Sequence, residues 1–141
     1  MMAMIPNVKL IAIFRNPVDR AYSQYNMCRS RRDSFGFEAY FTDSFDVVVR
    51  DEINTLRMFD ITASASATYE AFVRYVKHFC LDDLADHGCH CIVARSLYAL
   101  QLEPYNKHFP INKTIKILEV EDIDGSKEKT QSTVNQVFDF I

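Results

Sequence analysis

Glycine is scarce in this 141-residue chain, which contains only 3 glycines, where average usage would give about 10. This shortage disfavours β-sandwiches with many tight turns and favours helices. The sequence also has no apolar run close to the roughly 20 residues that a membrane-spanning helix needs. No membrane segment is therefore predicted within these residues.

The chain also has no excess of basic charge. Its 16 Lys and Arg residues are balanced by 19 Asp and Glu residues, which gives a formal net charge of −3. This balance argues against a nucleic-acid partner that is bound by bulk electrostatics. Apolar residues make up 48% and charged residues 25% of the chain, and both are ordinary values for a globular domain. The length allows one domain over residues 1–141.

The four cysteines do not form a recognisable metal-site pattern. Cys89 and Cys91 lie beside His87 and His90, but no second Cys/His pair follows at a spacing typical of zinc sites. We therefore interpret the cysteines as thiols near a helix start, and we expect no bound metal.

A short apolar run at residues 9–14 predicts a strand that is buried on both faces, as in a parallel sheet. A helix should follow almost at once, because Asn16 is a good N-cap residue and Pro17 suits the first helical position. We expect this helix to continue to about Cys28. Its predicted apolar stripe consists of residues spaced by three or four positions: Val18, Ala21, Tyr22 and Tyr25.

The rest of the sequence predicts more helices and one more strand. Two strands alone do not make a stable parallel sheet, so we expect an incomplete, helix-rich α/β domain. The expected elements are a helix from Ser44 to about Leu56, a helix over 69–79, a longer helix over 91–109 that Pro104 kinks, a strand over 114–120 and a final helix over 127–141, in which Val134, Val137, Phe138 and Ile141 are spaced to pack. Loops are expected at 29–41, 61–68 and 81–88.

The junction between the first strand and the first helix predicts an anion-binding site. In open α/β sheets, ligands bind beyond the carboxyl ends of the strands, and a helix N-terminus there presents N–H groups and partial positive charge. Arg15 adds a planar fork of donors, and Ser23 adds a hydroxyl nearly two turns into the helix. Each charge-assisted hydrogen bond to a phosphate contributes about 1.5–3 kcal/mol. The alternative is that Arg15 pairs with Asp19 on the surface and Ser23 is an ordinary helix residue.

The exact string from Lys9 to Tyr25, Lys-Leu-Ile-Ala-Ile-Phe-Arg-Asn-Pro-Val-Asp-Arg-Ala-Tyr-Ser-Gln-Tyr, closely resembles the 3′-phosphate-binding segment of sulfotransferases. It looks most like the Golgi carbohydrate branch, which includes the heparan sulfate N- and O-sulfotransferases. The resemblance implies that Arg15 and Ser23 hold the 3′-phosphate of the donor, 3′-phosphoadenosine 5′-phosphosulfate (PAPS). It also implies a P-loop NTPase-like fold, with a parallel sheet and flanking helices.

Later segments resemble the same family in the same order. Residues 94–102 and 105–110 look like its Arg-Gly-x-Tyr helix and the Phe-Pro that ends it, and strand 115–120 with Glu121 and Asp122 looks like its strand and Glu-Asp-Leu turn. The final helix, 127–141, is similar to the one that ends in Phe-Leu. Two residues depart from the pattern, since Ser96 stands where the family usually has glycine and Pro104 interrupts a regular helix.

The resemblance implies transfer of a sulfuryl group from PAPS to a hydroxyl or amine acceptor, with a glycan as the favoured acceptor and the Golgi lumen or membrane as the location. The family's Lys/Gly/Thr-rich loop for the 5′-phosphosulfate is not found in these residues. We therefore expect this chain to carry the 3′-phosphate half of the donor site in an incomplete domain. No catalytic residue is assigned, because no motif places a histidine (His78, His87, His90 or His108) near Arg15.

Two other functions stay open. The chain is alternatively a non-catalytic sulfotransferase-like module that binds nucleotide or partner chains without transfer, or another P-loop-type phosphotransferase that binds ATP more tightly than 3′-phosphoadenosine 5′-phosphate (PAP). Three arginines, Arg29, Arg31 and Arg32, are either a solvated loop or the lining of a glycan groove. We interpret Tyr22 and Tyr25 as core or helix-stripe residues of the first helix rather than as partners that stack on adenine.

Overall fold

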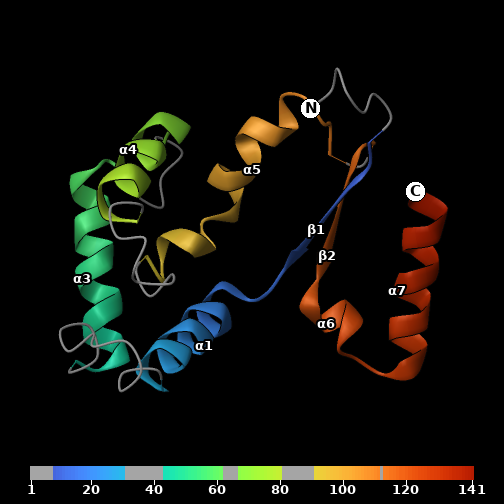
Figure 1. Cartoon of the computed structure of the whole chain (residues 1–141), viewed down its shortest axis with the longest axis horizontal. Helices are drawn as coiled ribbons and strands as arrows, with labels where there is room; N and C mark the ends of the chain where they lie inside the picture. Colours follow the sequence, from blue (N-terminus) through green and yellow to red (C-terminus); the bar gives the residue numbers. More distant parts are fainter. Residues whose placement is uncertain (1–7, 31–42, 62–66, 81–90, 112) are drawn as a thin grey trace. The chain divides into compact units, whose positions relative to one another are not determined.

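The described part of the chain is helix-rich with one small parallel sheet, which is an α/β arrangement (Figure 1). The computed structural model describes residues 8–30, 43–61, 67–80, 91–111 and 113–141. They belong to two compact units, one formed by Met1–Asn16 with Leu102–Ile141 and the other by Pro17–Gln101. The elements are, in chain order, β1 (Leu10–Phe14), α1 (Pro17–Ser30), α3 (Phe45–Met58), α4 (Tyr69–Phe79), the 3₁₀ helix η2 (Ala94–Ser96), α5 (Tyr98–Asn106), β2 (Ile115–Glu119), α6 (Val120–Ile123) and α7 (Lys127–Phe140).

Strands β1 and β2 of the first unit pair in parallel, from Leu10 opposite Ile115 to Phe14 opposite Glu119. This confirms both predicted strands and their parallel direction. The prediction that the first strand is buried on both faces is wrong for this unit, because Ile11 and Ile13 are 43% and 52% exposed. A two-stranded sheet is too narrow to cover both faces of its own strands, so alternate side chains of β1 face solvent.

Helix α6 is a single turn that directly follows β2, where the sequence indicated only a turn. The Asp122 carboxylate accepts a hydrogen bond from the backbone N–H of Glu119 at 3.0 Å, which stabilises the start of this turn. Two threonine hydroxyls of α7 donate to carbonyls of α6, Thr130 to Ile123 at 2.8 Å and Thr133 to Asp122 at 2.9 Å. These bonds fix which side of α7 faces inward.

The predicted final helix is present, but its predicted packing face is wrong. Val134, Phe138 and Ile141 are all exposed, and Phe138 has 68% of its surface accessible. Thr133 is the buried residue of α7, and the ring of Phe140 lies 4.7 Å from the Lys9 ammonium. The helix is held by hydroxyl bonds and a cation–π contact rather than by its apolar stripe.

The second unit has its core between α3, α4 and the η2 segment. Helix α4 matches its predicted range, and its N-cap Thr68 accepts from the backbone N–H of Ala71 at 3.2 Å. Helix α3 begins where the sequence predicts, although the Ser44 hydroxyl donates to the Asp46 carboxylate instead of capping the backbone. The core is a cluster of buried residues from these segments: Leu56, Ile61, Ala71, Phe72, Tyr75, Cys91 and Ala94.

The long helix predicted over 91–109 is interrupted, and the interruption is not at Pro104. The 3₁₀ helix η2 ends at Ser96, Leu97 leaves helical geometry with a ψ of 64°, and α5 starts at Tyr98 with Pro104 inside it. The Gln101 side-chain amide explains the break, because it donates to the Ala94 and Arg95 carbonyls at 3.4 and 3.0 Å. Those carbonyls are thus satisfied without a continuous helix.

Helix α1 begins at Pro17 as predicted but buries a different face. Its buried residues are Ala21, Gln24, Tyr25 and Cys28, whereas Val18 and Tyr22 are 65% and 52% exposed. Tyr25 is a core residue, as predicted, whereas Tyr22 is not buried but lies with its ring centroid 5.1 Å from that of Phe45. The polar Gln24 replaces an apolar residue on the inward face because its side chain accepts from Arg20.

None of the described helices is long and apolar enough to cross a bilayer.

Candidate functional site

Arg15 lies immediately after β1, at the edge of the sheet where both parallel strands end. Its strand neighbour Phe14 pairs with Glu119, the last residue of β2. The Arg15 side chain is exposed. This edge is where α/β sheets bind their ligands. A role for Arg15 in binding a phosphate stays a prediction.

Ser23 lies on α1 and belongs to the second unit. It is exposed, between the buried positions Ala21 and Gln24. Arg15 and Ser23 therefore both face solvent, but they are not brought together within one compact unit. Their joint contact with a phosphate stays a prediction.

Arg20 organises the first turns of α1. Its guanidinium donates to the Ser96 hydroxyl at 2.6 Å, to the Gln24 side-chain oxygen at 2.8 Å and to the carbonyl of Ile92. Burial lowers the pKa of Arg20, but an arginine retains its charge at physiological pH. Because its donors are used inside the second unit, we assign Arg20 a structural role.

Ser96 explains one departure from the family pattern. Its hydroxyl accepts from Arg20 and donates to the carbonyl of Pro17 at 3.1 Å, the first residue of α1. A glycine at this position would lack both bonds. The two sequence segments that resemble sulfotransferases therefore meet in space, at the start of α1 and the end of η2.

Glu52 stabilises η2 from helix α3. Its carboxylate oxygens accept from the backbone N–H groups of Val93 and Ala94, each at 2.9 Å, and from the Tyr75 hydroxyl at 3.3 Å. A carboxylate at the start of a helical turn is favourable. Glu52 is spaced by three or four positions from Val48, Val49 and Leu56, and a charged residue at this spacing is a sequence signal of a buried bond.

The interpretation of the cysteines as thiols is wrong. Cys80 and Cys91 form a disulfide with a Cα–Cα distance of 6.0 Å, and Cys28 is also disulfide-bonded. The packing of α4 against the η2 segment brings the first pair within bonding reach, which sequence spacing alone did not indicate. Cys89 lies outside the described residues.

The histidines and the arginines at 29–32 form no site within the described residues. His78 and His108 are exposed, and Arg29 is exposed in the last turn of α1. Within the described ranges, no group of three or more His, Cys, Asp or Glu side chains is placed to hold a metal. The residues that lie outside those ranges are His87, His90, Arg31 and Arg32.

Comparison with family models finds no match, and neither the curated proteins nor the solved structures show a significant similarity to this chain.

Proposed function

We propose that this chain carries the 3′-phosphate half of the donor site of a PAPS-dependent sulfotransferase with a P-loop NTPase-like fold. The observation that carries the proposal is the position of Arg15, exposed and directly beyond the carboxyl end of a parallel strand, with α1 starting at Pro17. At this edge Arg15 offers a guanidinium fork to a phosphate. Ser23 adds a hydroxyl if the phosphate extends along α1.

The contact between the two resembling segments supports the same proposal. The start of α1 is held by Ser96 through Pro17 and Arg20, so the first turn of this helix is fixed within the second unit. A preorganised site loses less entropy when it orders a ligand.

The proposed reaction transfers a sulfuryl group from PAPS to a hydroxyl or amine of a glycan. Such transfer requires in-line positioning and stabilisation of charge on the moving group. Arg15 and Ser23 contribute positioning, since they hold the donor at its 3′-phosphate, away from the reacting sulfur. The Cys80–Cys91 disulfide supports an oxidising compartment such as the Golgi lumen.

Isothermal titration calorimetry of the whole chain with PAP tests the donor site. Arg15→Ala should weaken PAP binding about 10-fold to 150-fold, because one charge-assisted interaction contributes about 1.5–3 kcal/mol. Ser23→Ala should weaken it less, by about 3-fold to 10-fold. Arg74→Ala is the matched control, because Arg74 is an exposed arginine on α4. A chain that does not bind PAP, or an Arg15→Ala variant that binds it as the wild type does, overturns the proposal.

A second assay separates the enzyme from its alternatives. We expect PAP to bind more tightly than ATP, and labelled sulfate from PAPS to appear on a glycan acceptor in the presence of the protein. PAP binding with no transfer to any acceptor contradicts the enzymatic function and favours the non-catalytic module. Tighter binding of ATP than of PAP favours a phosphotransferase.

A further inference from the structure

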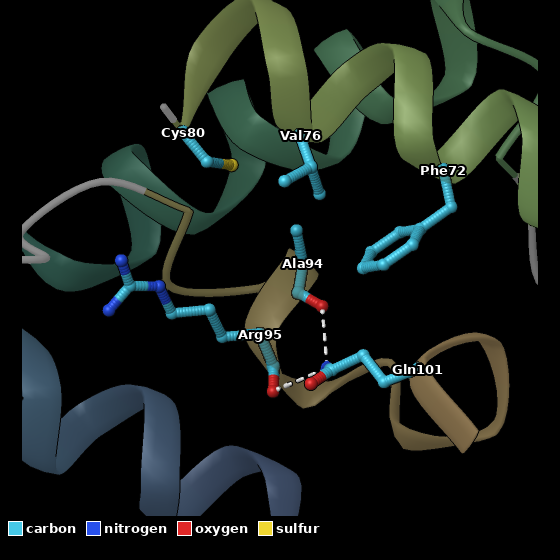
Figure 2. A pocket seen from close by; sticks show the side chains of 6 residues that line it. All are labelled: Phe72, Val76, Cys80, Ala94, Arg95 and Gln101. Carbon is cyan, nitrogen blue, oxygen red and sulfur yellow. Dashed lines mark hydrogen bonds between the residues drawn. The ribbon is translucent and has the colours of Figure 1, made fainter. Parts of the chain in front are cut away.

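The second unit contains a cavity of about 280 Å³ that the donor-site residues do not line. It lies between α4 and the segment from η2 to α5 (Figure 2). Its volume corresponds to about nine waters of liquid, which is enough for a small organic molecule. Six residues line it: Phe72, Val76, Cys80, Ala94, Arg95 and Gln101.

The walls of this cavity are mainly apolar. Phe72 and Val76 project from α4, and the methyl group of Ala94 lies between them and η2 (Figure 2). Cys80 completes the wall with its disulfide to Cys91. Apolar walls favour an apolar ligand body, because binding removes both surfaces from water.

One end of the cavity is cationic. The Arg95 side chain is exposed and makes no hydrogen bond or ion pair with another described residue. It extends away from Phe72 and Gln101, so that its guanidinium lies at the end of the cavity on the side of Cys80 (Figure 2). The Gln101 amide nitrogen is already bonded to the Ala94 and Arg95 carbonyls. Arg95 is therefore the lining group that is available to recognise charge.

Within the described ranges, no carboxylate forms an ion pair with Arg95. The Glu52 carboxylate on α3 is bonded to two backbone N–H groups and the Tyr75 hydroxyl. Arg20 adds a second positive charge close enough for Arg95 to lower its pKa, although burial lowers that pKa more. An anion at Arg95 would thus meet a complementary field.

We propose that this cavity binds a small amphiphilic monoanion, with its apolar body against Phe72, Val76 and Ala94 and its anionic head on Arg95. A medium-chain alkyl carboxylate has this chemistry and a suitable size. The site is separate from the donor site at Arg15 and does not depend on the proposed transferase function.

Calorimetric titration of the whole chain with octanoate tests the proposal. Wild-type protein should bind octanoate, and Arg95→Met should weaken binding about 10-fold to 100-fold through loss of the charge-assisted contact. Arg74→Met is the matched control, since Arg74 lies on α4 but does not line the cavity, and it should leave affinity within about 2-fold. Absence of octanoate binding, or equal affinities for wild type and Arg95→Met, overturns the proposal.

Two further measurements locate the ligand. The methyl resonances of Val76 should shift during the octanoate titration, and neutral octanol should bind wild type and Arg95→Met equally. Val76→Phe should fill the cavity and abolish binding while the far-ultraviolet circular dichroism spectrum stays that of the wild type. Unshifted Val76 methyls, or a folded Val76→Phe variant that retains full affinity, would place octanoate elsewhere and refute the site.

Discussion

Replacement of Glu52 by alanine should destabilise the second unit far more than replacement of an exposed residue of α3. The carboxylate accepts from the N–H groups of Val93 and Ala94 at 2.9 Å each. Ala94 is only 1% exposed, so water cannot replace the lost acceptor at its N–H group. The variant would leave a buried backbone donor without a partner.

The magnitude follows from these bonds. A hydrogen bond to a charged group contributes about 1.5–3 kcal/mol, so the two bonds together set an upper range of about 3–6 kcal/mol. Because Val93 and Glu52 are only half-buried, solvent recovers part of this, and we expect a loss of about 2–4 kcal/mol. Glu52→Gln keeps one oxygen as an acceptor and should lose about half as much.

Urea unfolding of the whole oxidised chain, followed by circular dichroism, measures this loss. With a slope of about 2 kcal/mol per molar urea, the middle of the usual range, Glu52→Ala should lower the midpoint by about 1–2 M. Asp51→Ala is the matched control, because Asp51 is the exposed neighbour on the same helix and should change stability by less than about 0.5 kcal/mol. Equal midpoints for the Glu52→Ala and Asp51→Ala variants would refute the structural role of Glu52.

Two further predictions concern the disulfide and the start of α6. The double variant Cys80→Ser/Cys91→Ser should lose about 3 kcal/mol of unfolding free energy in the same urea assay. The reason is that the disulfide closes a loop with a sequence separation of 11 and restricts the unfolded chain. A double variant as stable as the wild type would contradict this prediction. The Glu119 N–H and then Lys129 lower the pKa of Asp122 below its ordinary value of 3.8, so the ionised carboxylate stabilises the fold above about pH 4. The difference in urea midpoint between wild type and Asp122→Asn should therefore vanish as pH falls through the folded-state pKa, and a difference that persists unchanged in acid would exclude this ionisation as its cause.

The elements that the sequence predicts well are those with local causes. The apolar run before Arg15 is a strand, and Pro17 starts a helix, because strand burial and the fixed φ of proline act within a few residues. Thr68 caps α4 for the same reason. The parallel pairing of β1 and β2 agrees with the continuous apolar run of β1, although β2 contains Lys116 and Glu119.

The faces and breaks of the helices depend on partners that are distant in sequence. Helix α1 turns Gln24 inward because Arg20 reaches across to Ser96 and Ile92, and no periodicity rule contains that contact. The break at Leu97 depends on the Gln101 amide, which donates to the carbonyls of Ala94 and Arg95. Sequence rules treat proline as the main helix breaker, so they do not predict this break.

The candidate site also has one part that local residue chemistry predicts and one part that depends on packing. Residue chemistry singles out Arg15 and Ser23, because a guanidinium and a hydroxyl beside a helix start suit a phosphate. Residue chemistry does not distinguish Arg15 from Arg20, because Arg20 occurs in the same motif and has the same charge. The difference comes from packing. Arg20 donates hydrogen bonds to Ser96, Gln24 and Ile92, whereas Arg15 is exposed at the carboxyl edge of the sheet. Arg20 therefore has a structural role, and Arg15 is the residue whose replacement the proposed function predicts to weaken ligand binding.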